Sequence, residues 1–333
     1  MSKEWTADDI MRMAGAYQAS CVLLAGVQLD LFTVLDNGPR EETGLAAALG
    51  CPPRSFAMLL TALEALGLVR RENGVVSIED TACAFLSKNS PDYLGFIIRH
   101  HGNLMPGWQK LVQAVYTGSR TAMESALLTQ NDQEREDFLM GMYNVARLQA
   151  DRIAKALDLS GRKTLLDVGG GPGAYAVFFC QANPELRCTV FDLPTSEPFA
   201  QKTIARYDLE ERIRFAAGSY LTDPLPKNQD VAWLSQVLHG ETPGNAAGLV
   251  QNAAKALNPG GLLCIQEFVL DDDRKGPPRA ALFDLNMLVG TDGGQVYTEE
   301  EISRMMQKAG ARNIRELSVT LPESCRIFIG DMP

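Results

Sequence analysis

The 333-residue sequence has no excess of positive charge, only three histidines and no cysteine pair of the metal-binding kind. Its 31 Lys and Arg residues are outnumbered by 41 Asp and Glu residues, so nucleic acid is a poor partner because its phosphates would be repelled. The seven cysteines form no C-x-x-C motif, and no zinc site is predicted. We expect Cys21, Cys180 and Cys264, which have apolar neighbours, to be reduced and buried.

Targeting signals and long apolar segments are also missing. The first thirty residues lack a basic start followed by an apolar core and a small-residue cleavage site. No apolar run reaches the roughly 18 residues that a membrane span needs. Together with the cysteine usage, these absences predict a cytoplasmic protein without a membrane partner.

The first hundred residues have the pattern of short helices. The stretch SCVLLAGVQLDLFTVL, residues 20–35, is apolar on most faces and predicts a buried helix pair or an interface helix. A short helix is expected at 43–50. After Pro52 and Pro53, apolar residues recur on one helical face at i, i+3, i+4, i+7 and i+10. These residues are Phe56, Leu59, Leu60, Leu63 and Leu66.

A hairpin signal follows these helices. Asn73 and Gly74 stand between two short β-prone runs, which is the strongest short-range indication of a hairpin. Helix, turn, helix and hairpin in this order predict a winged helix. A DNA-reading role is disfavoured because Arg54 is the one cation in the recognition-helix position, with Arg70 and Arg71 at the wing. The apolar excess of residues 20–35 favours a dimerisation module instead.

The rest of the chain, from residue 101, begins with helical linkers and changes period near Lys163. The helix expected at 138–157 carries an apolar stripe that either packs in the core or faces a ligand cavity. Beyond Lys163, β-runs alternate with helical segments, which predicts a parallel doubly wound sheet. The runs NIRELSVTL and SCRIFIG lie close together near the end of the chain and predict an antiparallel hairpin at the sheet edge.

The motif LLDVGGGPGAYA combines a strand, a glycine loop and a helix start. Gly169 and Gly171 match the dinucleotide motif G-x-G-x-x-A together with Ala174. They also match G-x-G-x-G together with Gly173, so this motif alone does not identify the ligand that binds. Asp167 directly precedes the loop, where a carboxylate would be poorly placed beside a pyrophosphate. It is better suited to holding the loop or accepting from an amino group.

Two further strand ends complete this ligand site. Asp192, about 20 residues after the loop, is placed to hold a ribose diol, although it could instead be the N-cap of the next helix. Gly218 and Ser219 follow the third strand and are placed to border an adenine. Carboxyl ends of adjacent parallel strands are where ligands of such sheets bind.

The motifs LLDVGGGPG, VFDLP, GSYLTDPLP, LSQVLHGE, ALNPGGLLCIQEFVLDDD and FDLNMLVGTDGGQVYTEEE, in this order and spacing, resemble the S-adenosylmethionine-dependent small-molecule O-methyltransferases. That family includes plant caffeate-type, acetylserotonin and bacterial antibiotic O-methyltransferases. The resemblance covers nearly the whole chain. It implies a winged-helix dimerisation domain at 1–100, then linker helices and a Rossmann-like class I methyltransferase domain at 101–333. That domain would have a mostly parallel seven-stranded sheet with an antiparallel last strand.

The resemblance also implies how S-adenosylmethionine would be held. The glycine loop would face its amino-acid part, Asp192 its ribose, and Leu193 would pack on its adenine. Ser219 stands where many relatives carry aspartate, and Ser235 where plant relatives carry a cofactor-contacting lysine. The predicted cofactor-binding residues are Asp167, Gly169, Gly171, Asp192, Leu193, Gly218, Ser219, Tyr220 and Ser235.

His239, in LSQVLHGE, occupies the position of the family's catalytic base. Histidine is mostly neutral at pH 7 and can accept a phenol's proton during methyl transfer. Glu267, at the end of the next strand, matches the carboxylate that orients this base. Two positions depart from the plant pattern: Gly240 replaces an aspartate, and Val296 replaces a second flanking glutamate.

The predicted substrate-binding residues are Trp108, Met142, Tyr143, Asn286 and Met287. His100 and His101 are either near the substrate pocket or an exposed helix-surface pair. The acidic run 271–273 is interpreted as a solvated loop, so catalysis is predicted to be metal-independent. The predicted reaction is O-methylation of a phenol or enol on an aromatic or polyketide-like molecule by a homodimer. Decarboxylation or hydroxylation with the same cofactor, and a ligand-sensing DNA-binding regulator, remain alternatives.

Overall fold

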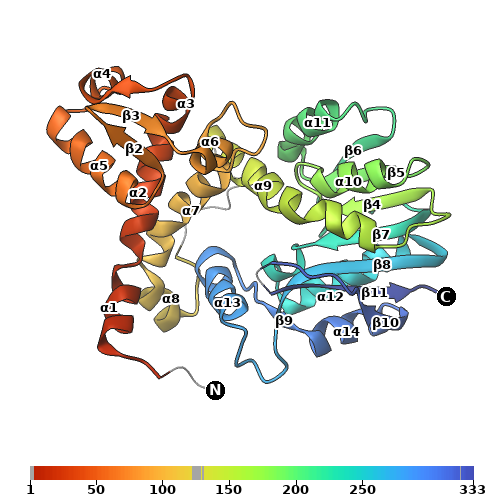
Figure 1. The fold of residues 1–333 in the computed structure, drawn as a ribbon. Coiled ribbons are helices and arrows are strands. Elements are labelled where there is room, and N and C mark those ends of the chain that lie inside the picture. Colours follow the sequence, from red (N-terminus) through yellow and green to blue (C-terminus); the bar gives the residue numbers. More distant parts are fainter. Residues whose placement is uncertain (1–3, 122–128, 130, 323) are drawn as a thin grey trace. The chain divides into compact units, whose positions relative to one another are not determined.

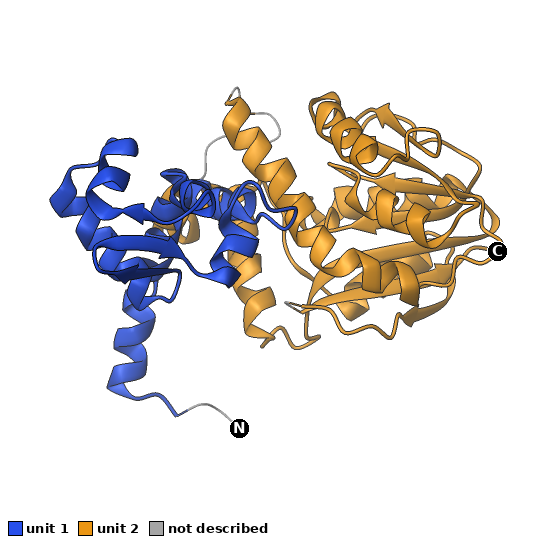
Figure 2. Cartoon of the chain, turned by 45° about the horizontal axis from the view of Figure 1, so that its top comes forward, with its two compact units in different colours: residues 1–103 blue, residues 104–333 orange. Residues whose placement is uncertain are grey.

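The computed structural model describes residues 4–121, 129, 131–322 and 324–333. The chain divides into two compact units, residues 1–103 and 104–333, coloured separately in Figure 2. The helix α7, Gly95–Trp108, contains the division. Each unit is described below by itself.

The N-terminal unit contains six helices before α7 and a small sheet among its described residues. Its elements are α1 Ala7–Gly15, α2 Tyr17–Gln28, α3 Leu31–Asp36, β1 Arg40–Glu41, α4 Glu42–Ala48, α5 Pro53–Ala65, β2 Val69–Glu72, β3 Val75–Ile78 and α6 Asp80–Leu86.

The predicted hairpin is confirmed, since β2 pairs antiparallel with β3. Asn73 and Gly74 both have positive φ angles, 53° and 78°, as a tight two-residue turn requires. The sheet also contains β1, which pairs with β3 and which the sequence pattern did not indicate. Its two residues are too short to show an alternating pattern.

The core of this unit forms around α5. The buried residues Phe56, Leu60 and Leu63 lie on one face of that helix, as their spacing predicts. Leu66 is the exception, because it caps the helix end and is 47% exposed. Gly26 of α2 lies so close to Phe32 that a Cβ atom would come within 2.8 Å of the ring.

The apolar stretch 20–35 forms α2 and α3, as expected for a helix pair. Cys21 is exposed on α2, so its predicted burial is wrong, whereas Cys180 and Cys264 are buried. Among the described residues, Ala7–Gln28 is long and apolar enough to cross a membrane, and α4 with α5 would count as a second, bent candidate. Core helices and N-terminal signals have the same composition, so this similarity carries little weight.

The C-terminal unit alternates strands and helices as predicted. Its elements are α8 Leu111–Thr117, α9 Asp132–Ala156, β4 Thr164–Val168, α10 Ala174–Ala182, β5 Arg187–Asp192, η1 Pro194–Ser196, α11 Glu197–Arg206, β6 Ile213–Ala217, β7 Gln229–Ser235, η2 Leu238–Gly240, α12 Pro243–Lys255, β8 Leu257–Leu270, α13 Pro278–Gly290, β9 Tyr297–Thr298, α14 Glu299–Lys308, β10 Arg312–Glu316 and β11 Cys325–Asp331.

The large sheet has the order β10-β11-β8-β7-β4-β5-β6, with the short β9 added beside β8 (Figure 1). Neighbours from β8 to β6 run parallel, and β11 is antiparallel to both β8 and β10. The predicted antiparallel last strand and the predicted antiparallel hairpin at the sheet edge are both confirmed: β10 forms the edge, and β11 lies between β10 and β8. Helices α10 and α11 cover one face, and α12 and α14 cover the other (Figure 1). The carboxyl ends of the parallel strands therefore meet at one edge.

Burial on α5 makes a test of the N-terminal core possible. Leu60→Ala should lower the free energy of unfolding by about 2–5 kcal/mol, because Leu60 is fully buried and its loss leaves a cavity. Met58→Ala, on the same helix but 61% exposed, should change it by less than about 0.5 kcal/mol. Urea denaturation of the full chain, followed by circular dichroism, measures both. Equal effects would contradict the assigned core.

Candidate active site

The glycine loop joins β4 to α10 in a conformation that favours glycine. Gly169, Gly171 and Gly173 have φ angles of +68°, +52° and +73°. A Cβ atom on Gly169 would also come within 2.5 Å of Val237 Cγ1. The loop is thus held both by its backbone conformation and by close contact with the chain after β7.

Asp167, the carboxylate before this loop, is buried and lacks a hydrogen-bond partner among the described residues. Burial, and secondarily the nearby carboxylate of Asp192, raises the pKa of Asp167 to about 7. A buried carboxylate in this condition is stabilised by any positive group that approaches it.

Asp192, at the end of β5, ties the second strand end to the glycine loop. Its Oδ2 accepts a hydrogen bond from Gly171 N at 2.7 Å, and its Oδ1 accepts from Leu193 N and Ser196 Oγ. Helix α11 begins after Ser196, so Asp192 is not its N-cap. Burial raises the pKa of Asp192, although these hydrogen bonds oppose the shift. One acceptor direction on Oδ2 remains for a ligand hydroxyl.

The chain after β6 forms the third part of this edge. A Cβ atom on Gly218 would come within 2.5 Å of the Phe191 ring, so the chain passes close over β5. Ser219 donates its backbone N–H to Asp223 Oδ2 at 2.8 Å. A carboxylate therefore does lie beside Ser219, supplied four residues later in the chain. Tyr220 is half-buried and donates its hydroxyl to Glu241 Oε1 at 3.0 Å.

Ser235, at the end of β7, is directed toward a polar cluster. Its Oγ donates to Gln266 Oε1 at 3.0 Å. Burial raises the pKa of the nearby Tyr175, and the Ser235 and Gln266 side chains only partly oppose that shift. Gln149 Nε2 donates to the Tyr175 hydroxyl at 2.9 Å. Ser235 therefore bonds Gln266 of β8, beside the pair formed by Tyr175 of α10 and Gln149 of α9.

His239 and Glu267 are brought together as the sequence predicts. His239 lies in η2 just after β7, and its Nδ1 is 2.7 Å from Glu267 Oε2. The other oxygen, Oε1, accepts from Leu238 N at 2.7 Å and from His239 N at 3.4 Å. The Glu267 side chain is 1% exposed and that of His239 is 13% exposed. One buried carboxylate thus fixes both the imidazole ring and the turn that carries it.

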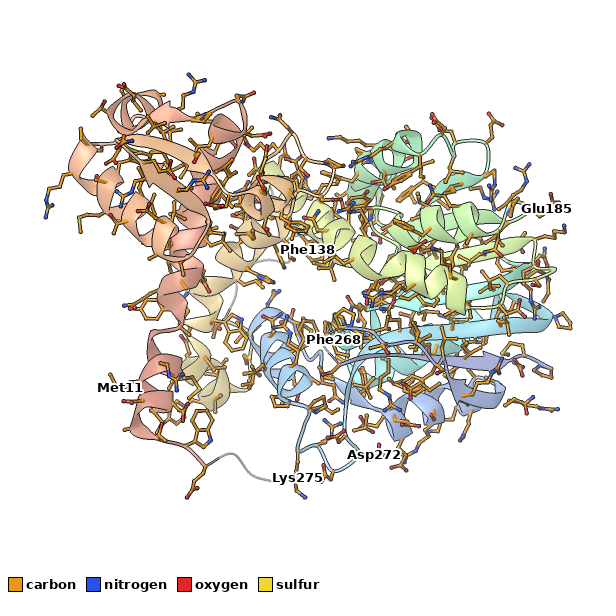
Figure 3. All side chains as sticks on the ribbon, viewed as in Figure 1. Met11, Phe138, Glu185, Phe268, Asp272 and Lys275 are labelled. Atoms are coloured by element: carbon orange, nitrogen blue, oxygen red, sulfur yellow. The ribbon has the colours of Figure 1, made fainter. Side chains whose placement is uncertain are left out.

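Aromatic residues enclose the imidazole on another side. The Phe283 ring of α13 meets it edge-to-face, with centroids 4.8 Å apart. Phe268, labelled in Figure 3 at the end of β8, packs on Phe283 with centroids 4.1 Å apart. Val296 is fully buried in the same apolar cluster. Gly294 lies against the His239 carbonyl, since a Cβ atom there would be 2.4 Å from that oxygen.

The predicted substrate-binding residues fall into two groups. Trp108 Nε1 donates to Asn286 Oδ1 at 2.9 Å, so α13 holds the indole, and Met287 is buried on the same helix. On α9, Met142 is half-buried, whereas Tyr143 is buried with its hydroxyl 2.8 Å from that of Tyr207. The Tyr143 hydroxyl is therefore occupied within the protein.

His100 and His101 belong to the N-terminal unit, on α7, and the site described here is built from the C-terminal unit. Burial, and secondarily the neighbouring His101, lowers the pKa of His100 to about 4. His101 is exposed but His100 is half-buried, so the two do not form a fully exposed pair, and a place near the substrate pocket remains a prediction.

Acidic clusters with the composition of a metal site do not occur among the described residues. In the acidic run 271–273, Asp272 accepts from Glu300 N and Asp273 pairs with Lys275. Asp272 and Lys275 are labelled in Figure 3. These carboxylates are bound by neighbouring groups of the loop and of α14.

Comparisons with known proteins show which family the chain belongs to. A family model for the O-methyltransferase domain matches residues 108–312, and one for the O-methyltransferase dimerisation domain matches residues 11–88. The 3-hydroxy-5-methyl-1-naphthoate 3-O-methyltransferase of Streptomyces sahachiroi is 33% identical over 92% of this chain and 90% of its own length. The tetracenomycin polyketide synthesis 8-O-methyl transferase TcmO of Streptomyces glaucescens is 33% identical over 96% and 95%.

Solved structures give the same result. PigF of Serratia sp., an S-adenosyl-L-methionine-dependent methyl transferase, is 28% identical over 97% of this chain and 95% of its own length. The structure of PigF with SAH covers 98% of this chain and 100% of that one, with a TM-score of 0.89 and 27% identity. This chain belongs to the S-adenosylmethionine-dependent O-methyltransferase family. The predicted class I methyltransferase fold with an N-terminal dimerisation domain is confirmed.

The residues of this methyltransferase fit its cofactor by two structural observations. Asp167 presents a buried carboxylate without a partner, which suits the ammonium group of S-adenosylmethionine. The glycine loop offers a surface without side chains, and at Gly169 even a methyl group would collide with Val237. A ligand lying against this loop would meet backbone atoms directly.

The sequence did not reveal Glu241, whose carboxylate receives the Tyr220 hydroxyl. It also missed the cluster of Gln149, Tyr175 and Gln266 around Ser235. These contacts join segments far apart in the chain. No local pattern signals them, although Glu241 stands only two residues after His239.

The raised pKa of Asp167 predicts a pH-dependent effect on stability. Between about pH 4 and the folded-state pKa of about 7, the unfolded chain loses this proton while the folded chain keeps it. The contribution of Asp167 to stability is therefore present below pH 4 and lost as the pH rises through 7. Asp167→Asn removes this loss, so the cofactor-free variant should be more stable than the wild type at pH 8.

Thermal unfolding at pH 4.5 and pH 8 measures the effect. We expect a gain on the order of a few kcal/mol at pH 8, since each unit of pKa shift corresponds to about 1.4 kcal/mol. At pH 4.5 the gain should be much smaller. Asp208→Asn, which replaces an exposed carboxylate, is the control. A gain at pH 8 no larger than at pH 4.5 would contradict the assignment.

Proposed function

We propose that this methyltransferase methylates a phenol or enol hydroxyl of a hydrophobic small molecule, with His239 as general base. The observation that carries this proposal is the 2.7 Å contact between His239 Nδ1 and Glu267 Oε2. A carboxylate at Nδ1 favours the tautomer with the proton on that nitrogen, which leaves Nε2 free to accept the proton of the substrate.

Glu267 acts through His239. It orients the ring and stabilises the imidazolium that forms when the substrate hydroxyl is deprotonated. It also holds η2 through Leu238 N and His239 N, so ring and backbone are fixed by the same group. Val296 and Gly240 contribute no carboxylate here, so among the residues that the structure describes Glu267 is the carboxylate paired with the imidazole.

The proposed cofactor-binding residues line the carboxyl ends of β4 to β7. When bound, S-adenosylmethionine supplies a methyl group already activated by the positive charge of its sulfonium. Asp167 would bind its ammonium group, with Gly169 and Gly171 against the amino-acid part. Asp192 would use the remaining acceptor direction of Oδ2 for a ribose hydroxyl. The adenine would lie among Leu193, Gly218, Ser219 and Tyr220. Ser235 remains a proposed cofactor-binding residue, held by its hydrogen bond to Gln266.

We propose an aromatic or polyketide-like molecule as the methyl acceptor. Phe268 and Phe283 form an apolar wall beside His239, which suits a flat aromatic ring better than a charged one. Trp108, Met142, Tyr143, Asn286 and Met287 remain the proposed substrate-binding residues. Two of the relatives above carry names of naphthoate and tetracenomycin methyltransferases, which supports this class.

We further propose that residues 1–100 form a dimerisation domain and that the enzyme is a cytoplasmic homodimer. The dimerisation-domain match and the exposed apolar side chains of α1 and the start of α2 support this. Met11, Met13 and Tyr17 are 70%, 60% and 63% exposed, and Met11 is labelled in Figure 3. Such surface is stabilised when a second copy covers it. The net charge of −10 argues against a nucleic-acid partner.

The non-methylating alternative and the DNA-binding alternative have no supporting observation. The relatives reported above are named as methyltransferases. In the wing, Arg71 is paired with Glu64 and lies near Glu42, so it is not free to contact phosphates.

Turnover with a panel of aromatic polyketide phenols tests the reaction itself, since each product should gain the mass of one CH2 group. On an accepted substrate, His239→Ala should lower kcat by at least ~100-fold, the usual contribution of a positioned base. The dissociation constant of S-adenosylmethionine, measured by calorimetry, should stay within about 2-fold. Glu267→Gln, which keeps an acceptor but loses the charge, should have an intermediate rate. Unchanged turnover of His239→Ala would refute the role of base.

A further inference from the structure

Glu241 closes the turn that carries His239. Its backbone N–H donates to Leu238 O at 3.0 Å, which ends η2. Its own carbonyl accepts from the Tyr297 hydroxyl at 2.9 Å. Glu267 holds the N–H groups of Leu238 and His239, which come before Glu241 in the chain. Glu267 therefore fixes the first two residues of this short turn, Leu238 and His239, and the contacts of Glu241 fix its end.

The Glu241 carboxylate joins two different parts of the fold. Oε1 accepts from the Tyr220 hydroxyl at 3.0 Å, and Oε2 accepts from Asn245 Nδ2 at 3.1 Å. Tyr220 follows β6 in the region proposed to border the adenine. Asn245 lies in the first turn of α12, directly after η2. One oxygen thus faces the cofactor side, and the other faces the helix that follows the turn.

Tyr220 is well placed to connect the cofactor loop with Glu241. Its ring lies 3.4 Å from where a Cβ atom of Gly169 would be, so it packs beside the glycine loop. Burial, and then the charge of Glu241, raises the pKa of Tyr220, so its hydroxyl stays protonated and donates. A neutral hydroxyl that donates to a carboxylate forms a strong, charge-assisted hydrogen bond.

We propose that Glu241 is a positioning residue for methyl transfer, which links Tyr220 at the cofactor loop to the turn that bears His239. The proposal depends on the function proposed above, in which His239 is the base. Through this link, the segment beside the glycine loop and the base keep a fixed separation. A base must lie within hydrogen-bond distance of the proton it removes, so a small displacement of η2 lowers the rate.

The Tyr220–Glu241 bond can be removed without removing the ring that would contact the cofactor. Tyr220→Phe keeps the ring against Gly169 and loses only the donor to Glu241. We expect kcat to fall about 10-fold, while the dissociation constant of S-adenosylmethionine and the KM of the acceptor change by less than about 3-fold. A purely structural role would instead change binding and thermal stability together with the rate.

Asn245→Ala is the matched control, because it also removes one hydrogen bond to the Glu241 carboxylate but on the side away from the cofactor. Its kcat should stay within about 2-fold of the wild type. Glu241→Ala should lower kcat as much as Tyr220→Phe does, and Glu241→Gln, which keeps an oxygen acceptor, should restore most of the rate. The double variant Tyr220→Phe/Glu241→Ala should be no slower than either single variant, since both break the same link.

Two results would overturn the proposal: a Tyr220→Phe variant no slower than Asn245→Ala, or a double variant whose losses multiply. His239→Ala, assayed in parallel, separates this inference from the function on which it depends. If His239→Ala keeps its turnover, the base assignment fails. If it loses turnover while Tyr220→Phe and Asn245→Ala are alike, only the positioning role of Glu241 fails.

Discussion

The site depends on the buried carboxylate of Glu267. A carboxylate at 1% exposure is costly to the fold unless hydrogen bonds satisfy it. Here it receives Leu238 N, His239 N and His239 Nδ1, all from a turn of three residues. The same contacts that make Glu267 tolerable in the interior also place the imidazole. The satisfaction of this buried carboxylate and the proposed role of His239 thus depend on the same geometry.

The parallel sheet brings these groups together. Strands β7 and β8 are in register, with Ser235 beside Gln266, so Glu267 lies within β8 next to the turn that follows Ser235, three residues before β8 ends. Asp167 and Asp192 end β4 and β5 at the same edge. Because each strand end supplies one group, four segments distant in sequence form one site. The helices on both faces hold the strands, and the loops at the edge carry the chemistry.

This division explains what the sequence could predict. The Asn73–Gly74 hairpin, the α5 stripe, Asp192 at the end of β5 and the pairing of His239 with Glu267 follow from local patterns, and the structure contains them. Glu267 itself was expected to end its strand, but β8 continues to Leu270. The two-residue β1, the inward position of β11 and the exposure of Cys21 depend on long-range packing, which local patterns do not encode.

The hydrogen-bond partners of the site's side chains also could not be predicted from the sequence. Tyr143 bonds Tyr207, and Ser235 bonds Gln266, through contacts between separate elements. A motif gives the position of such a residue along its own element. The direction of its hydrogen bond depends on which element packs opposite, and that is decided by the assembled core.

The apolar side chains beside His239 also depend on how the core is assembled. Val296 lies in a cluster with Phe268 and beside Phe283, where it is fully buried. A glutamate at this position would place a second charge in an apolar environment next to two aromatic rings, at a large desolvation cost. Valine and the phenylalanines are therefore consistent with one another. The imidazole of the proposed base is held by Glu267 at Nδ1 and by aromatic packing from Phe283, surroundings that suit the proposed hydrophobic aromatic acceptor.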